Sequence, residues 1–213
     1  MEILYTDNRI AVAIKPCGVL STDETGGMPQ LLRKELCTEC IRTVHRLDAS
    51  VSGVMVFARS KMAASLLSAQ IRNGTFQKEY LAVVHGRFAQ PDGILRDLLV
   101  HDTVRRKTFV ASQPQKDAKQ AELSYRVLGQ LGDLSLLSLR LHTGRTHQIR
   151  VQLASRDHAI LGDKKYGLAE EHNVALFSHR LRFLHPQTNE WMDFSAPAPD
   201  EYPWTLFKKE GFL

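Results

Sequence analysis

Short apolar segments separated by turn-forming residues are the feature that most constrains how this chain can fold. Each is of strand length, and glycine, proline, asparagine or aspartate residues lie between them. We expect strands at residues 3–5, 10–14, 54–58, 76–84, 122–128, 134–141, 176–184 and 190–194. No apolar run approaches the roughly 20 residues that a membrane helix requires. The pattern predicts a globular protein built around a sheet.

Helical spacing is clearest over residues 60–74. Ser60 is a good N-cap, apolar residues follow at helical intervals, and Gly74 is typical of a helix end. Shorter helices are expected at residues 29–36 and 200–209, whereas residues 90–120 look like loops around a short hairpin. We predict an α+β fold, with a mixed, largely antiparallel sheet, packed helices and a basic cleft where loops from several strands meet.

Length and charge restrict the class of protein further. A chain of 213 residues with 43% apolar content suits one domain, or one sheet-centred body with two lobes, and we predict a single catalytic domain over residues 1–213. Lys and Arg number 28 against 23 acidic residues, a net charge of +5 that suits a phosphate-rich partner without requiring one. The positive charge is concentrated in two clusters, which suggests a binding track. They comprise Arg105, Arg106 and Lys107, and then Arg145, Arg150, Arg156, Lys164 and Lys165.

The N-terminal residues and the cysteines point to a cytosolic protein. Charged and polar residues follow Met1 to Tyr5 at once, unlike a signal peptide. Three cysteines cannot all pair with one another, so we expect free thiols. Cys37 and Cys40 with His45 nearby could suggest zinc, but a structural zinc site needs four ligands, and we expect no metal.

Residues 45–59, HRLDASVSGVMVFAR, place one carboxylate between a basic pair and a polar turn that precedes an apolar strand. The segment around Asp48 is too polar for a core and too rich in small residues for a helix, so we expect a loop that feeds the strand. An aspartate at a strand entrance can act on a ligand. The alternative is an aspartate that only turns the backbone with its own side-chain oxygen.

Residues 141–167, LHTGRTHQIRVQLASRDHAILGDKKYG, carry a dense set of guanidinium, imidazole and amide donors, which indicates an anionic ligand. Together with the Lys15-Pro16-Cys17-Gly18 and Lys78-Glu79-Tyr80 motifs and the Asp48 segment, this stretch resembles the pseudouridine synthases of the RluA family. Four motifs occur in the family's order, and the likeness runs from about Ile3 to Pro199. One departure is Val51, where the family usually has threonine.

The resemblance implies a reaction and a set of catalytic residues. A uridine within RNA is isomerised: the N1 to C1′ bond breaks, the base rotates and C5 becomes bonded to C1′, without a cofactor. Asp48 matches the essential aspartate, which acts as nucleophile or as base. Arg145 is expected to hold that carboxylate bidentately, although a phosphate contact is the alternative. Tyr80 matches a tyrosine that stacks on the flipped uracil near C5, with ordinary strand packing as the alternative.

Substrate-binding residues follow from the same resemblance. Arg46 matches the arginine that occupies the space left by the flipped nucleotide, with a plain phosphate contact as the alternative. The basic residues Arg150, Lys164, Lys165 and Arg105 could contact phosphates. Residues 146–157 alternate like a strand, but their length and the resemblance favour a helix, in which Ile149 faces the core or lines the base. His45, His142 and His147 are expected to be hydrogen-bonding scaffold, and Asp163 to be structural.

The expected substrate is structured RNA, ribosomal or transfer, with an accessible loop uridine, because base flipping is easiest where bases are partly unstacked. The Lys-Pro motif falls at residue 15, so we expect no N-terminal S4 RNA-binding domain, and no obligate protein partner is implied. A different class stays open: an RNA-binding, folding or assembly factor that uses the same cleft without chemistry. A glycosidase would call for two cooperating carboxylates, and Asp163 is the plausible second.

Overall fold

The computed structural model describes residues 1–168 and 170–213, and the chain divides into two compact units. Residues 1–79 and 177–197 form the first unit, and residues 80–176 and 198–213 form the second. The prediction of one catalytic domain over residues 1–213 stays a prediction. Within the described ranges, no helix combines the length and apolar character needed to cross a membrane.

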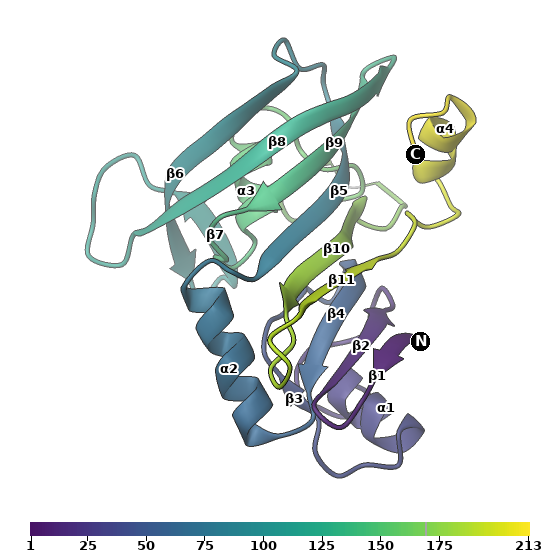
Figure 1. Ribbon diagram of the computed structural model, residues 1–213. Coiled ribbons are helices and arrows are strands. Elements are labelled where there is room, and N and C mark those ends of the chain that lie inside the picture. The colour runs from purple at the N-terminus through teal and green to yellow at the C-terminus, as the bar shows by residue number, and fades with distance from the viewer. Residues whose placement is uncertain (169) are drawn as a thin grey trace. The chain divides into compact units, whose positions relative to one another are not determined.

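Strands of the first unit make a mixed, mostly antiparallel sheet, shown in Figure 1. Its main order is β1-β2-β4-β10, while β3 pairs with β4 and β11 pairs with β10. The β4–β10 pair is parallel and the other pairs in this unit are antiparallel. The strands are β1 (Glu2–Thr6), β2 (Ile10–Lys15), β3 (Arg42–Thr43), β4 (Ser52–Ala58), β10 (Leu176–Leu184) and β11 (Trp191–Ser195).

Two helices belong to the first unit, α1 (Met28–Glu35) and α2 (Lys61–Arg72). The Ser60 hydroxyl accepts a hydrogen bond from the Ala63 N–H at 3.1 Å, which confirms the predicted N-cap. The Gln70 side chain then bonds both the N–H and the carbonyl of Leu184 in β10, at 2.8 and 2.7 Å. Helix α2 is thereby tied to the sheet by polar contacts as well as by the buried Leu67.

Strands of the second unit follow the order β5-β9-β8-β6-β7. The β9–β8, β8–β6 and β6–β7 pairs are antiparallel. Helix α3 (Gln148–Ala154) packs against β6 and β7 (Figure 1), and α4 (Trp204–Lys209) lies near the C-terminus. The strands are β5 (Gln77–His85), β6 (Asp92–Asp102), β7 (Lys107–Val110), β8 (Lys119–Leu131) and β9 (Leu134–Leu141).

The predicted α+β fold with its largely antiparallel sheet is confirmed. Most strands and helices lie where they were predicted, although α4 begins only at Trp204, and the region between β5 and β8 needs correction. Residues 90–120 do not consist of loops around a short hairpin, because β6 is an eleven-residue strand paired with β8 from Asp92 to Leu99. Charged residues hid this strand, and the structure gives them partners. Arg96 bonds Glu122 on β8 at 2.8 Å, and Asp97 accepts two bonds from Arg156 at 3.0 Å.

The burial of helix α3 explains why its sequence alternates like that of a strand. Every residue from Gln148 to Leu153 is buried, so the helix has no polar outer face to reveal a helical period. The helix predicted for residues 146–157 is present, but it covers only Gln148–Ala154.

Candidate active site

Asp48 lies in an irregular loop between β3 and β4, as predicted. Its side chain is half-buried, while the preceding Leu47 is buried and Arg46 is exposed. The Val51 N–H donates to the Asp48 carbonyl oxygen at 3.0 Å and closes a turn. This turn depends on backbone atoms, and the Val51 side chain is buried. The replacement of the family's usual threonine therefore leaves the turn around the aspartate in place.

Lys15 binds the backbone of Ala49, the residue that follows Asp48. Its ammonium nitrogen is fully buried and donates to the carbonyl oxygens of Pro16, Val19 and Ala49 at 2.9, 2.7 and 3.1 Å. Burial lowers the pKa of Lys15 to about 8, against the opposing effect of the Cys17 and Asp48 charges. The Gly18 N–H reaches the same Ala49 oxygen at 2.8 Å. Lys15 belongs to the Lys-Pro motif, but sequence reasoning assigned it no role at the site.

His45 supports the start of the loop as a neutral ring. The Val56 N–H donates to His45 Nε2 at 3.1 Å, so Nδ1 carries the ring hydrogen. Burial, together with the Lys78 charge, lowers the pKa of His45 to about 3. Among the described residues, Nδ1 has no hydrogen-bond partner. A buried, uncharged ring that bonds a strand N–H suits the scaffold role predicted for it.

In the second unit, Arg145 lies in the loop between β9 and α3, with an exposed side chain. Its N–H donates to Gln148 Oε1 at 3.0 Å, and its Nε donates to the Gln120 carbonyl at 2.8 Å. Gln148 also accepts from the Thr143 hydroxyl at 2.8 Å and donates to the Glu122 carbonyl at 3.1 Å. The buried Gln148 amide thus organises the loop that carries Arg145.

The other predicted site residues of the second unit fall into buried and exposed groups. Tyr80 in β5 is 5% exposed, and Ile149 in α3 is 4% exposed. Lys164 and Lys165 are exposed. The Lys165 ammonium donates to the Arg106 carbonyl at 2.8 Å, so one residue of each basic cluster of the sequence meets here.

Arg150 differs from the other basic residues because it is buried against Asp163. Its Nε and Nη2 donate to the two oxygens of that carboxylate, each at 2.7 Å. Burial raises the pKa of Asp163, but the Arg150 guanidinium and two backbone N–H groups outweigh it and hold the pKa below its usual value. The pair supports the structural role expected for Asp163 and favours a similar role for Arg150.

A polar cluster around Tyr166 joins β7 to the start of α3, and sequence reasoning missed it. The Tyr166 oxygen accepts from the Thr108 N–H at 2.7 Å and lies 2.8 Å from His147 Nδ1. The Thr108 hydroxyl donates to the Thr146 carbonyl at 2.9 Å. His147 has a positive φ of 55°, which the bonded ring helps to hold. The only signal was the position of Tyr166 within the donor-rich segment.

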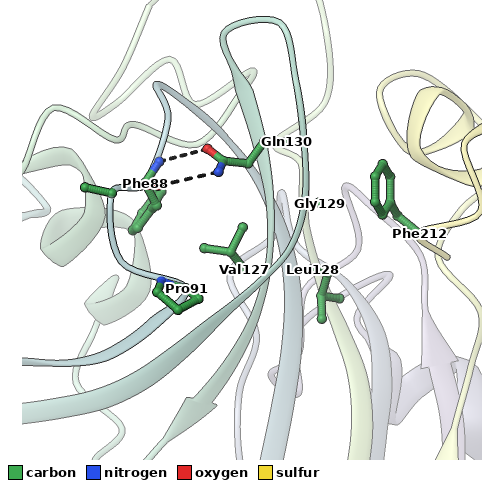
Figure 2. Close-up of a pocket in the computed structure, with 8 residues that line it drawn as sticks. Phe88, Pro91, Val127, Leu128, Gly129, Gln130 and Phe212 are labelled. Carbon is green, nitrogen blue, oxygen red and sulfur yellow. Dashed lines mark hydrogen bonds between the residues drawn. The ribbon is translucent and has the colours of Figure 1, made fainter.

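An open cavity of about 300 Å³ in the second unit lies elsewhere (Figure 2). The Gln130 amide spans the N–H and carbonyl of Phe88 there, at 3.0 and 3.4 Å. The lining is mostly apolar and includes no predicted site residue. It consists of Phe88, Ala89, Pro91, Val127, Leu128, Gly129, Gln130 and Phe212.

The fold is that of solved pseudouridine synthases. The human RNA pseudouridylate synthase domain containing 4 matches with a TM-score of 0.80 at 22% identity, over 98% of this chain and 93% of its own. The human RNA pseudouridylate synthase domain containing 1 matches with a TM-score of 0.78 at 23% identity, over 93% of this chain and 83% of its own. At such identities the likeness concerns the fold.

Sequence comparison establishes the family. The profile described as RNA pseudouridylate synthase matches residues 9–155. An uncharacterized RNA pseudouridine synthase of Bacillus subtilis, YlyB, is 32% identical over 94% of this chain and 70% of its own. Ribosomal large subunit pseudouridine synthase D of Zymomonas mobilis is 30% identical over 98% and 72%. The chain belongs to the RNA pseudouridylate synthase family, and is accordingly an isomerase that forms pseudouridine in RNA.

Proposed function

We propose that this enzyme isomerises specific uridines in structured ribosomal or transfer RNA, with Asp48 as the reacting carboxylate. The observation that carries the proposal is the loop around Asp48, whose backbone is bound by buried groups at Leu47 and Ala49 while the side chain is half-buried. Such a loop offers a carboxylate in a defined place, which a general turn aspartate does not need. The name of the Zymomonas mobilis relative supports testing large-subunit ribosomal RNA first.

Arg145 and Tyr80 complete the proposed catalytic set. Arg145 is to hold the Asp48 carboxylate in its ionised form, and the Gln148 contact that fixes its backbone supports this role. Tyr80 is to stack on the flipped uracil, with its hydroxyl near the C5 that loses a proton as N1 gains one. Tyr80 is buried in β5, so this role is proposed from its place in the Lys78-Glu79-Tyr80 motif.

The RNA contacts are proposed from exposure and charge. Arg46 is exposed two residues before Asp48 and is to fill the space left by the flipped base. Lys164 and Lys165, with Arg105, are to contact phosphates from the surface where the two basic clusters meet. Arg150 and Ile149 are buried, and we assign both to packing around α3. The enzyme is to act on RNA in the cytoplasm.

The test maps pseudouridine in cells that lack the gene. Carbodiimide adducts on pseudouridine stop primer extension, so ribosomal and transfer RNA are compared after complementation with wild type, Asp48→Asn or Asp117→Asn. Asp117 is an exposed loop aspartate and serves as the control. We expect wild type and Asp117→Asn to restore the same stops and Asp48→Asn to restore none. Restoration by Asp48→Asn would overturn the catalytic role, and stops that are the same with and without the wild-type gene at every position would favour an RNA-folding factor.

A further inference from the structure

Ser21 makes a two-sided contact with the residue before Asp48. Its hydroxyl donates to the Leu47 carbonyl oxygen at 2.7 Å and accepts from the Leu47 N–H at 3.0 Å. Ser21 is 3% exposed and Leu47 is 8% exposed, so water does not compete freely for these groups. One small side chain therefore pairs both peptide groups of a single loop residue.

The backbone of Ser21 is itself held in place. The Thr43 hydroxyl, at the end of β3, donates to the Ser21 carbonyl at 2.9 Å. On the far side of Asp48, Lys15 and Gly18 bind the Ala49 carbonyl. Residues 15–21 consequently fix the backbone on both sides of the aspartate, through three different chemical groups.

We propose that Ser21 is a positioning residue for Asp48, setting the direction in which the carboxylate leaves the loop. The inference rests on the proposed function, because it takes Asp48 as the reacting group. A hydroxyl suits the task because it donates and accepts at once, whereas a methyl group leaves two buried peptide groups unpaired. The backbone at Leu47 would then shift to find other partners, and a small shift of a reacting group lowers turnover strongly.

The variants separate positioning from general stability. Ser21→Ala removes the hydroxyl, Ser21→Cys keeps the volume with a weak donor, and Ser21→Thr keeps the hydroxyl. Ser135→Ala is the matched control: this fully buried hydroxyl donates to the Gly86 carbonyl at 2.7 Å in the second unit. Thermal unfolding shows that each variant is folded and compares the stability losses.

Two measurements are made on each full-length variant. Tritium release from RNA labelled with [5-³H]uridine, taken from cells lacking the gene, gives kcat and KM, since C5 loses its hydrogen when it bonds C1′. Amide hydrogen exchange follows the segment 44–51. We expect Ser21→Ala and Ser21→Cys to lower kcat on the order of tenfold to a hundredfold, with KM changed less than about twofold. Exchange should rise in that segment, and Ser21→Thr should restore both.

The outcomes are distinct. Ser135→Ala is expected to lose stability and keep kcat. A kcat for Ser21→Ala equal to that of Ser135→Ala at matched stability would overturn the positioning role, as would unchanged exchange at Leu47. Wild-type protein that releases no tritium from any RNA would instead count against the proposed function. Hydrogen exchange would still decide whether Ser21 holds the loop.

Discussion

The side-chain ammonium of Lys15 lies 3.1 Å from the carbonyl oxygen of Ala49, the residue that follows Asp48. This fully buried cation donates to three carbonyl oxygens, so backbone dipoles hold it in place. Burial therefore dominates its titration and lowers the pKa of Lys15 to about 8. The contact links the protonation of Lys15, in the Lys-Pro motif, to the loop that carries Asp48.

This lowered pKa predicts a specific dependence of stability on pH. Between about pH 8 and 10.5 the unfolded chain holds a proton on Lys15 that the folded chain has lost, so the unfolding free energy should rise with pH through this window. The rise, relative to Lys15→Met, should reach at most about 3 kcal/mol. Urea unfolding of both proteins from pH 7 to 10 measures it. A constant difference between them would contradict the prediction.

Replacement of Asp163 by asparagine should strongly destabilise the second unit. The change keeps an acceptor for the Lys165 N–H but leaves the buried Arg150 guanidinium without its counter-charge. We expect a loss of about 3–5 kcal/mol in unfolding free energy. Arg150→Met combined with Asp163→Asn should recover part of it, because no unpaired charge then remains. Chemical denaturation of the wild type and of these two variants checks this, and equal losses in the single and the double variant would refute it.

Salt dependence should reveal the RNA contacts of the basic surface. Lys164→Ala and Lys165→Ala should each weaken RNA binding and reduce the slope of log affinity against log salt by about 1. Lys61→Ala, an exposed lysine at the start of α2, is the control and should leave the slope unchanged. Fluorescence anisotropy with a labelled RNA hairpin at several salt concentrations gives the slopes. Identical slopes for all proteins would exclude these two lysines from the interface.

Two buried glutamines on α3 allow the Arg145 loop to be tested. Gln148→Met removes the acceptor of the Arg145 N–H and should lower kcat on the order of tenfold, by loosening that loop. Gln152→Met removes a buried amide that bonds Asp97 at 2.7 Å and should cost stability alone. Tritium release and thermal unfolding separate the effects. Similar kcat values in both variants at equal stability would show that Gln148 does not position the Arg145 loop for catalysis.

Much of the fold could be predicted because its signals are local. The Ser60 cap and the apolar spacing after it define α2, and turn residues separate most of the strands. Strand β6 was missed because Arg96 and Asp97 are charged, and only the folded chain supplies Glu122 and Arg156 as their partners. Local pattern cannot show a partner that lies far away in sequence.

The candidate site shows the same division. Asp48 and Arg145 could be located in loops beside strands, since motifs and turn residues mark such positions. The burial of Arg150 could not be predicted, because a guanidinium in a basic segment suggests a phosphate contact. Only the structure shows that Asp163 binds it. Ser21 likewise gave no signal, as its partner Leu47 is 26 residues away.

The contacts at Leu47 and Ala49 have a thermodynamic consequence for substrate binding. Because the peptide groups on both sides of Asp48 are bound within the folded chain, the loop loses its conformational entropy during folding. In the proposed reaction, RNA that enters the site meets an Asp48 carboxylate whose backbone is already ordered. More of the binding free energy is thus left to offset the unstacking of the uridine, which itself costs free energy.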